Sequence, residues 1–134
     1  MQPKFSRALG VALMRFVQAI SSGFSNYVSF SGRARRSAYW YWTLFATLVT
    51  GVAFSIDVVF GTLLTNIIVV IATLGLCLPG LAVTIRRLHD TNHSGWWVLL
   101  AFGTIPGVLL LIFWFCMKGT EGPNRFGPDP MVSS

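Results

Sequence analysis

Charged side chains are almost absent from two long stretches of this sequence. Residues 37–85 contain one charged side chain, Asp57, and residues 91–117 contain no Asp, Glu, Lys or Arg. Over all 134 residues, 54% are hydrophobic and 10% are charged, whereas a water-soluble domain has about 25% charged residues. The composition excludes a disordered chain, and the length excludes a large multidomain enzyme. The sequence therefore predicts a small, multi-pass integral membrane protein.

Three apolar stretches are candidates for membrane-spanning helices, at about residues 38–60, 62–84 and 95–117. Roughly 20 helical residues cross the hydrocarbon core of a bilayer. Pro106 divides the third stretch into two halves that are each too short to span alone. We expect this stretch to cross fully with a kink at Pro106, and a re-entrant hairpin is the alternative. The expected fold class is an all-α integral membrane protein with three hydrophobic helices, the third kinked or re-entrant.

The N-terminal segment predicts a further helix of a different kind. Residues 4–26 place their apolar side chains on one side of a helical projection and Lys4, Arg7 and Arg15 on the other. Such a basic amphipathic helix is typical of a segment that lies in the membrane interface. A helix packed on the transmembrane helices is the alternative. Arg7 and Arg15 also interrupt any signal-peptide core.

The expected organisation has three parts. Residues 1–28 form the basic amphipathic helix, residues 29–130 form the membrane domain with a Gly/Pro-rich tail, and residues 131–134 form a disordered end. The tail contains two prolines that restrict the residues before them. This stiffness predicts that the tail packs back onto the helix ends.

The basic residues indicate both a partner and an orientation. The net charge is +6, and the bases flank the apolar stretches, so we expect anionic lipid headgroups rather than nucleic acid as the counter-charge. The positive-inside rule places residues 1–37 and 86–94 in the cytoplasm. A full third crossing puts the tail outside, whereas a re-entrant hairpin returns the tail to the cytoplasm.

Three polar segments carry a recognisable pattern. They are Gly32-Arg33-Ala34-Arg35-Arg36-Ser37-Ala38-Tyr39-Trp40, Arg86-Arg87-Leu88-His89-Asp90-Thr91-Asn92-His93-Ser94-Gly95-Trp96-Trp97, and Gly122-Pro123-Asn124-Arg125-Phe126-Gly127-Pro128-Asp129-Pro130. Together they resemble the domain-of-unknown-function 805 family of small bacterial inner-membrane proteins. The resemblance covers about residues 28–130 and implies a helical, multi-pass protein of the bacterial inner membrane. It implies no established activity, substrate or catalytic residue.

His89 and Asp90 are the candidates for catalytic chemistry, as a base oriented by a carboxylate. Adjacent helical residues do not face each other, and Asp90 follows Arg87 by three residues and Arg86 by four. A helical ion pair is therefore the favoured interpretation. His89 and His93 have the spacing of two metal ligands on a helix, but no third ligand stands nearby. We expect no metal site and no cofactor.

The candidate binding site is a basic and aromatic surface on the predicted cytoplasmic side. Guanidinium groups bind phosphate bidentately and stack on aromatic rings. The candidate binding residues are Arg33, Arg35, Arg36, Arg86, Arg87, His89, Trp40, Trp96 and Trp97. We assign roles in turns, helix ends and the tail to Gly32, Asp90, Ser94, Gly95, Pro106, Asn124, Arg125, Gly127, Pro128 and Asp129. The alternative is that the arginines only set the topology and anchor helix ends.

The expected function is that of a non-enzymatic inner-membrane protein whose basic, aromatic face engages anionic lipid headgroups or a partner protein. A homo-oligomer is one such partner. A subunit of an oligomeric transporter or channel is the first alternative, although the spans carry one acid, Asp57, to line a pathway. The second alternative is a lipid-headgroup-modifying enzyme that uses His89 and Asp90.

Overall fold

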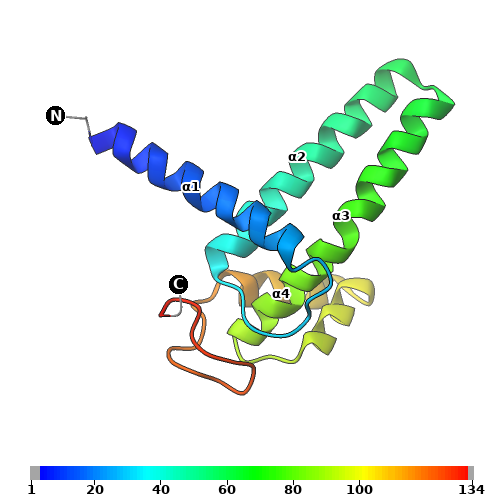
Figure 1. Cartoon of the computed structure of the whole chain (residues 1–134). Helices are drawn as coiled ribbons and strands as arrows, with labels where there is room; N and C mark the ends of the chain where they lie inside the picture. Colours follow the sequence, from blue (N-terminus) through cyan, green and yellow to red (C-terminus); the bar gives the residue numbers. More distant parts are fainter. Residues whose placement is uncertain (1–3, 133–134) are drawn as a thin grey trace.

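Residues 4–132 are described by a computed structural model and form an all-helical protein (Figure 1). The elements in chain order are α1 (Lys4–Ser25), α2 (Arg36–Phe60), α3 (Leu63–Asp90), the 3₁₀-helix η1 (Gly95–Phe102) and α4 (Ile105–Cys116). Helices α2 and α3 form a long hairpin, and α1 crosses this hairpin rather than running along it. Helices η1 and α4 and the tail surround the end of the hairpin where α2 begins and α3 ends, which we call the base. The predicted all-α fold is confirmed.

A two-residue turn joins α2 to α3, as the sequence predicts. Gly61 ends α2 with a φ of 53°, a left-handed conformation that glycine adopts without a Cβ penalty. Thr62 then begins α3 through a reciprocal capping box with Thr65. The Thr65 hydroxyl also donates to Asp57 Oδ1 at 2.6 Å. The single acid of the spans therefore has a partner at the tip of the hairpin.

Helix α3 contains a proline whose missing hydrogen bond is replaced from outside the helix. Pro79 has no N–H, so the carbonyl four residues earlier, that of Gly75, has no intrahelical donor. The Tyr27 hydroxyl, in the loop after α1, donates to this carbonyl at 2.5 Å. Tyr27 therefore ties the loop after α1 to the middle of α3.

Helix α1 packs on α2 through its C-terminal half. Gly23 is buried so closely against Trp42 that a Cβ atom at position 23 would lie 2.2 Å from the indole ring. Phe24 and Phe16 make edge-to-face contacts with Trp42 and Tyr41, at centroid distances of 5.3 and 5.9 Å. The predicted N-terminal helix is confirmed, and its packing matches the alternative given above. Its place in the membrane interface stays a prediction.

Helices α1, α2 and α3 are each long and apolar enough to cross a membrane. The predicted second span differs from α3 at its C-terminal end, because α3 continues to Asp90 instead of ending near residue 84. Residues 86–90 are all buried in the structure. Packing at the base supplies partners for these polar side chains, so the helix does not need to end where the apolar stretch ends.

The third apolar stretch breaks into η1 and α4. Thr104 caps α4 by accepting a hydrogen bond from the Gly107 N–H at 3.2 Å, and Pro106 occupies the first turn of α4. A proline is tolerated there because the first N–H groups of a helix have no intrahelical acceptor. The predicted interruption at Pro106 is therefore confirmed.

Both ends of this broken stretch lie at the base of the hairpin. Gly95 packs against Ile85 and His89 of α3, while Arg87 of α3 donates to the Phe115 carbonyl near the end of α4 at 3.2 Å. The stretch therefore folds back on itself, as in the hairpin alternative, and does not run in one direction as the expected full crossing requires; its entry into the bilayer stays a prediction. The cause is the length of the two halves, since neither can span alone and they pack on each other and on α3.

Candidate functional site

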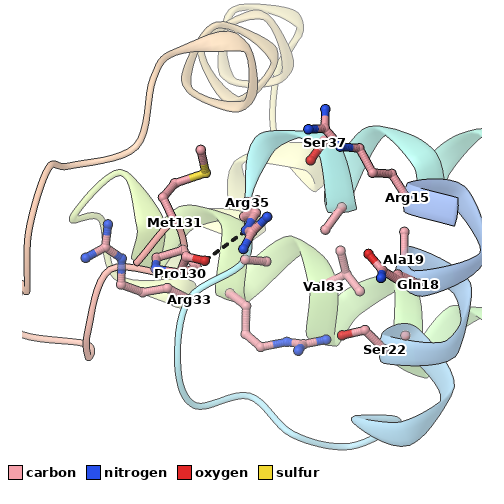
Figure 2. A pocket seen from close by; sticks show the side chains of 14 residues that line it. Arg15, Gln18, Ala19, Ser22, Arg33, Arg35, Ser37, Val83, Pro130 and Met131 are labelled. Atoms are coloured by element: carbon pink, nitrogen blue, oxygen red, sulfur yellow. Dashed lines mark hydrogen bonds between the residues drawn. The ribbon is translucent and has the colours of Figure 1, made fainter. Parts of the chain in front are cut away.

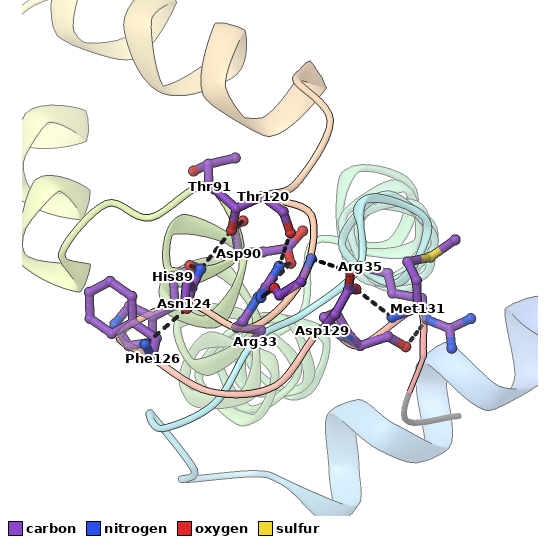
Figure 3. A network of polar contacts seen from close by, with 12 residues as sticks. Arg33, Arg35, His89, Asp90, Thr91, Thr120, Asn124, Phe126, Asp129 and Met131 are labelled. Carbon is purple, nitrogen blue, oxygen red and sulfur yellow. Dashed lines mark hydrogen bonds and ion pairs between the residues drawn. The ribbon is translucent and has the colours of Figure 1, made fainter.

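Asp90 is the centre of a buried polar network at the base (Figure 3). Its Oδ1 accepts a hydrogen bond from Arg33 Nε at 3.0 Å, and its Oδ2 accepts one from Arg87. The exposed fractions of these arginine side chains are 1% and 0%. The other nitrogens of Arg33 donate to the carbonyls of Thr120 and Gly122 at 2.5 and 2.6 Å. The predicted helical ion pair is confirmed for Arg87, and the network joins the loop before α2, the end of α3 and the tail.

The tail also caps α3 through backbone contacts. The Thr120 N–H and hydroxyl donate to the Asp90 carbonyl at 2.8 and 3.0 Å. The Asn124 amide donates to the His89 carbonyl at 2.9 Å. The last carbonyls of a helix have no intrahelical donor, so these contacts satisfy the C-terminal end of α3. The prediction that the tail packs back onto the helix ends is confirmed.

Arg87, together with Arg36, also holds the end of α4. Arg87 donates to the carbonyls of Phe115 and Met117, and Arg36 donates to the Cys116 carbonyl at 3.1 Å. Positive side chains at a helix C-terminus stabilise it, because its free carbonyls carry partial negative charge. Arg36 and Arg87 thus fix the re-entrant stretch to the base of the hairpin.

The two histidines are packed against aromatic rings. His89 stacks on Phe126 with centroids 4.0 Å apart, and its Nδ1 lies 3.0 Å from the Gly32 carbonyl oxygen. This carbonyl is only an acceptor, so Nδ1 carries the proton. His93 stacks on Trp114 at 3.9 Å, and burial lowers the pKa of His93. Within residues 4–132, no three His, Cys, Asp or Glu side chains come together as metal ligands.

The tail folds into a compact turn. Asn124 and Gly127 exchange two backbone hydrogen bonds of 3.0 and 3.1 Å, just before Pro128. Arg125 lies over the Phe126 ring, with its Cζ 4.7 Å from the ring centroid. The Asp129 carboxylate then accepts from the N–H groups of Met131 and Gly122 at 2.8 and 3.0 Å. These N–H donors, and next the charges of Arg33 and Arg35, lower the pKa of Asp129.

Two of the four residues in the disordered end predicted at residues 131–134 lie within the described part of the chain. Residues 133 and 134 lie outside the described part of the chain, whereas Met131 and Val132 belong to a turn closed on Asp129.

The tryptophans predicted at headgroup depth are partly exposed. The exposed fractions are 39% for Trp40, 79% for Trp96 and 46% for Trp97. Ser94 caps η1 by accepting from the Trp96 N–H at 3.5 Å. Gly95 is required by close packing, since a Cβ atom there would lie 2.6 Å from Ile85. The predicted structural roles of Ser94 and Gly95 therefore have a physical basis at the start of η1.

A separate pocket of about 360 Å³ lies between α1, the start of α2 and α3 (Figure 2). Figure 2 shows Arg15, Gln18 and Ser22 of α1 on one side of this pocket and Arg35 on the other. Arg35 also donates to the Pro130 carbonyl at 2.8 Å. We call this space the basic pocket, and its polar lining includes Arg15, Gln18, Ser22, Arg33, Arg35, Ser37 and Arg86.

Arg86 is a buried arginine of the basic pocket that has no carboxylate partner among the described residues. The residue is 7% exposed, and its Nε donates to the Ala82 carbonyl at 3.3 Å. Within residues 4–132, no carboxylate lies at ion-pair distance from Arg86. The four acids of the chain have other contacts: Asp57 with Thr65, Asp90 with Arg33 and Arg87, Glu121 with Lys118, and Asp129 with backbone N–H groups. The guanidinium stays charged, and among the described residues its terminal nitrogens are not fully buried polar atoms without a partner, so the group faces the open space of the basic pocket.

The structure divides the five arginines that the sequence places on one surface. Arg33 and Arg87 are buried around Asp90, and Arg36 caps α4. Of these five, Arg35 and Arg86 line the basic pocket with no carboxylate at ion-pair distance among the described residues, and the charge of Arg35 also acts on Asp129. The five do not form one exposed surface, because backbone carbonyls and Asp90 compete for their guanidinium groups. Headgroup binding itself stays a prediction.

Helix α1 supplies a wall of the basic pocket that the sequence pattern does not reveal. Arg15, Gln18 and Ser22 follow one another at intervals of three and four residues, so they lie on one face of the helix. That spacing is the available signal. The pattern alone predicts a polar face toward the membrane surface, and only the tertiary packing of α1 on α2 shows that this face lines a pocket.

The fold and the buried network define a small helical membrane protein in which a long hairpin is fixed at its base by a polar cluster. Residues 27–128 match the family described as "Protein of unknown function (DUF805)". The chain belongs to this family, which confirms the resemblance seen in its three polar segments.

Three proteins of Escherichia coli (strain K12) are similar to this chain. Inner membrane protein YhaI is 46% identical over 111 residues, which cover 81% of this chain and 92% of YhaI. Inner membrane protein YhaH is 44% identical over 110 residues, covering 80% and 91%. Uncharacterized protein YiiR is 31% identical over 131 residues, covering 75% and 85%. No solved structure matches. The chain is an inner-membrane protein with helical spans.

Proposed function

We propose that this protein is a non-enzymatic inner-membrane protein whose basic pocket binds the phosphate group of an anionic phospholipid. The observation that carries the proposal is the buried, unpaired charge of Arg86 inside that pocket. A phosphate accepts bidentate hydrogen bonds from a guanidinium and neutralises its charge. Phospholipid headgroups are the phosphates that a membrane protein meets at the highest concentration.

The surroundings of Arg86 fit a tetrahedral anion. Arg15 and Arg35 add two positive charges, and Gln18, Ser22 and Ser37 add neutral groups that can donate hydrogen bonds. Each basic residue near a bilayer surface contributes about 1 kcal/mol of attraction to anionic lipid. The pocket lies at the base of the hairpin, where α2 begins and α3 ends, and Arg33, Arg35 and Arg86 line it. The positive-inside rule assigns residues 1–37 and 86–94 to the cytoplasmic side.

The contacts of His89 and Asp90 support a role without catalysis. The Asp90 carboxylate already receives Arg33 and Arg87, and the His89 ring is stacked on Phe126 and bonded to Gly32. Groups held in this way serve the fold. We therefore rank the lipid-modifying enzyme below lipid binding. We also rank the transporter subunit below lipid binding, because the spans carry one acid.

A matched pair of charge-neutral variants tests the proposal. Arg86→Gln removes a positive charge inside the basic pocket, and Lys118→Gln removes one outside it, where Lys118 is paired only with exposed Glu121. Native mass spectrometry of the purified protein would measure retained phosphatidylglycerol against phosphatidylcholine. We expect Arg86→Gln to lower phosphatidylglycerol retention about tenfold, because a hydrogen bond to a charged group contributes about 1.5–3 kcal/mol. Lys118→Gln should leave retention unchanged.

Thermal unfolding separates this role from a structural one. Without added lipid, Arg86→Gln should unfold no earlier than the parent protein, since it removes an unpaired buried charge. With phosphatidylglycerol, only the parent and Lys118→Gln should gain stability. An Arg86→Gln protein that is destabilised in detergent and still retains the lipid would make Arg86 a structural residue. Loss of a co-purifying protein instead of lipid would favour the partner-protein alternative.

A further inference from the structure

A second basic depression adjoins the basic pocket along α1. This space, which we call the α1 groove, has a volume of about 600 Å³. Its basic lining is Lys4, Arg7 and Arg15 of α1, its apolar lining is Ala8, Val11 and Ala12, and Tyr41 of α2 also lines it. Arg15 lines both the α1 groove and the basic pocket. The two spaces are therefore neighbours that share one guanidinium.

The α1 groove carries positive charge with no local compensation. Helix α1 contains no acidic residue, and no described acid lines the groove. Arg7 and Arg15 are about 12 Å apart along the helix axis, at a rise of 1.5 Å per residue. Their long side chains can converge on a ligand that lies between them. A ligand with one anionic group in each space would use Arg15 from both sides.

The position of the α1 groove is suited to a lipid. Helix α1 leaves the hairpin at a steep angle (Figure 1), and the α1 groove lies between α1 and Tyr41 of α2. Leu44 and Leu48 follow Tyr41 by three and seven residues, which places them on the same face of α2. They are 50% and 55% exposed. Acyl chains of a lipid bound in the groove would meet these side chains.

We propose that the basic pocket and the α1 groove together bind one phospholipid that carries two phosphate groups, of the diphosphatidylglycerol class, with one phosphate in each space. The inference rests on the proposed function and deepens it, because a single phosphate already satisfies the basic pocket. The second phosphate gives a reason for the uncompensated bases of α1. Lys4, Arg7 and Arg15 lie outside residues 27–128, so the α1 groove is built from a segment that the family match does not include.

Binding of the second phosphate is intramolecular once the first is held, so it raises affinity without requiring a second lipid to be captured. We expect the full-length protein to prefer diphosphatidylglycerol over phosphatidylglycerol by about tenfold or more at equal phosphate concentration. Native mass spectrometry with nanodiscs of either composition, in a phosphatidylcholine background, measures this ratio and the stoichiometry. One diphosphatidylglycerol per protein is expected.

Three variants locate the two phosphates. Arg7→Gln removes a positive charge that lines only the α1 groove, and Arg86→Gln removes one that lines only the basic pocket. Lys118→Gln removes a positive charge that lines neither space. Arg7→Gln should reduce diphosphatidylglycerol binding to the level of phosphatidylglycerol and leave phosphatidylglycerol binding unchanged. Arg86→Gln should weaken both lipids. Lys118→Gln should change neither, which controls for the loss of one charge.

The outcomes separate the two proposals. Equal affinity for both lipids, or two lipids bound at once, overturns the two-phosphate inference and leaves the proposed function standing. An Arg7→Gln variant that loses both lipids equally also overturns the inference. Failure of the parent protein to retain either anionic lipid above phosphatidylcholine overturns both. A competition experiment uses inorganic pyrophosphate as a soluble ligand with two phosphate groups. Displacement of diphosphatidylglycerol by pyrophosphate at low concentration would show that the site takes a free diphosphate instead of a lipid.

Discussion

Gly119 packs so closely against Asp90 that a Cβ atom at position 119 would lie 2.1 Å from the carboxylate oxygen Oδ2. The tail passes at this point over the ion pairs that Asp90 makes with Arg33 and Arg87. No side chain fits there without moving the carboxylate away from its two guanidinium partners. The close approach explains why a glycine follows α4 at the start of the tail.

The first prediction is that Gly119→Ala destabilises the protein by about 1–3 kcal/mol, the usual cost of overpacking a tight site. Thermal unfolding in detergent measures the change. Gly51→Ala is the matched control, because a Cβ atom at position 51 in α2 would have nothing within 4 Å. Equal stability of the two variants would contradict the close packing of the tail on Asp90.

The second prediction concerns the Asp90 carboxylate. Asp90→Asn leaves Arg33 and Arg87 buried without a counter-charge, so we expect a loss of about 3–5 kcal/mol. Glu121→Gln removes the same charge from an exposed pair with Lys118, and its cost should be far smaller because water screens that pair. Unfolding temperatures of both variants, measured in the same detergent, test the difference. The buried network is not needed for stability if the two losses are equal.

The third prediction tests the contact between Tyr27 and α3. Tyr27→Phe removes the donor to the Gly75 carbonyl, and we expect a loss of about 1–2 kcal/mol. Pro79→Ala restores a backbone N–H four residues after Gly75, so the loss from Tyr27→Phe should shrink in the Pro79→Ala background. The double-mutant cycle of unfolding free energies measures this coupling. Strictly additive effects would show that Tyr27 does not replace the hydrogen bond that Pro79 removes.

The parts of the fold that the sequence predicts are those governed by local composition. The scarcity of charge over residues 37–85 predicts the hairpin, and Gly61 with Thr62 predicts its turn. The helical ion pair of Asp90 with Arg87 follows from a spacing of three residues. Each of these features depends on residues close in sequence, so a one-dimensional pattern contains the necessary information.

The candidate site was harder to predict because its partners are distant in sequence. Arg33 reaches Asp90 across 57 residues and Gly122 across 89. A run of arginines beside apolar spans predicts a headgroup-binding surface. The run does not show which guanidinium groups donate to backbone carbonyls in the folded protein. Arg86 and Arg87 are neighbours in sequence, yet one faces the basic pocket and the other the Asp90 network. Their separation follows from the helical rotation of about 100° per residue combined with packing on both faces of α3.

The last prediction concerns the side of the membrane on which the tail lies. Thr120 and Asn124 bind the last carbonyls of α3, and Arg33 binds the tail from the loop before α2. The tail and that loop therefore share one side, which the positive-inside rule identifies as the cytoplasm. A reporter active only in the cytoplasm, fused after residue 134, should be active. A periplasmic reporter fused after Phe60 should also be active, because α2 ends at the opposite end of the hairpin. A periplasmic signal from the fusion after residue 134 would require the tail to leave the base of the hairpin and would contradict the re-entrant fold.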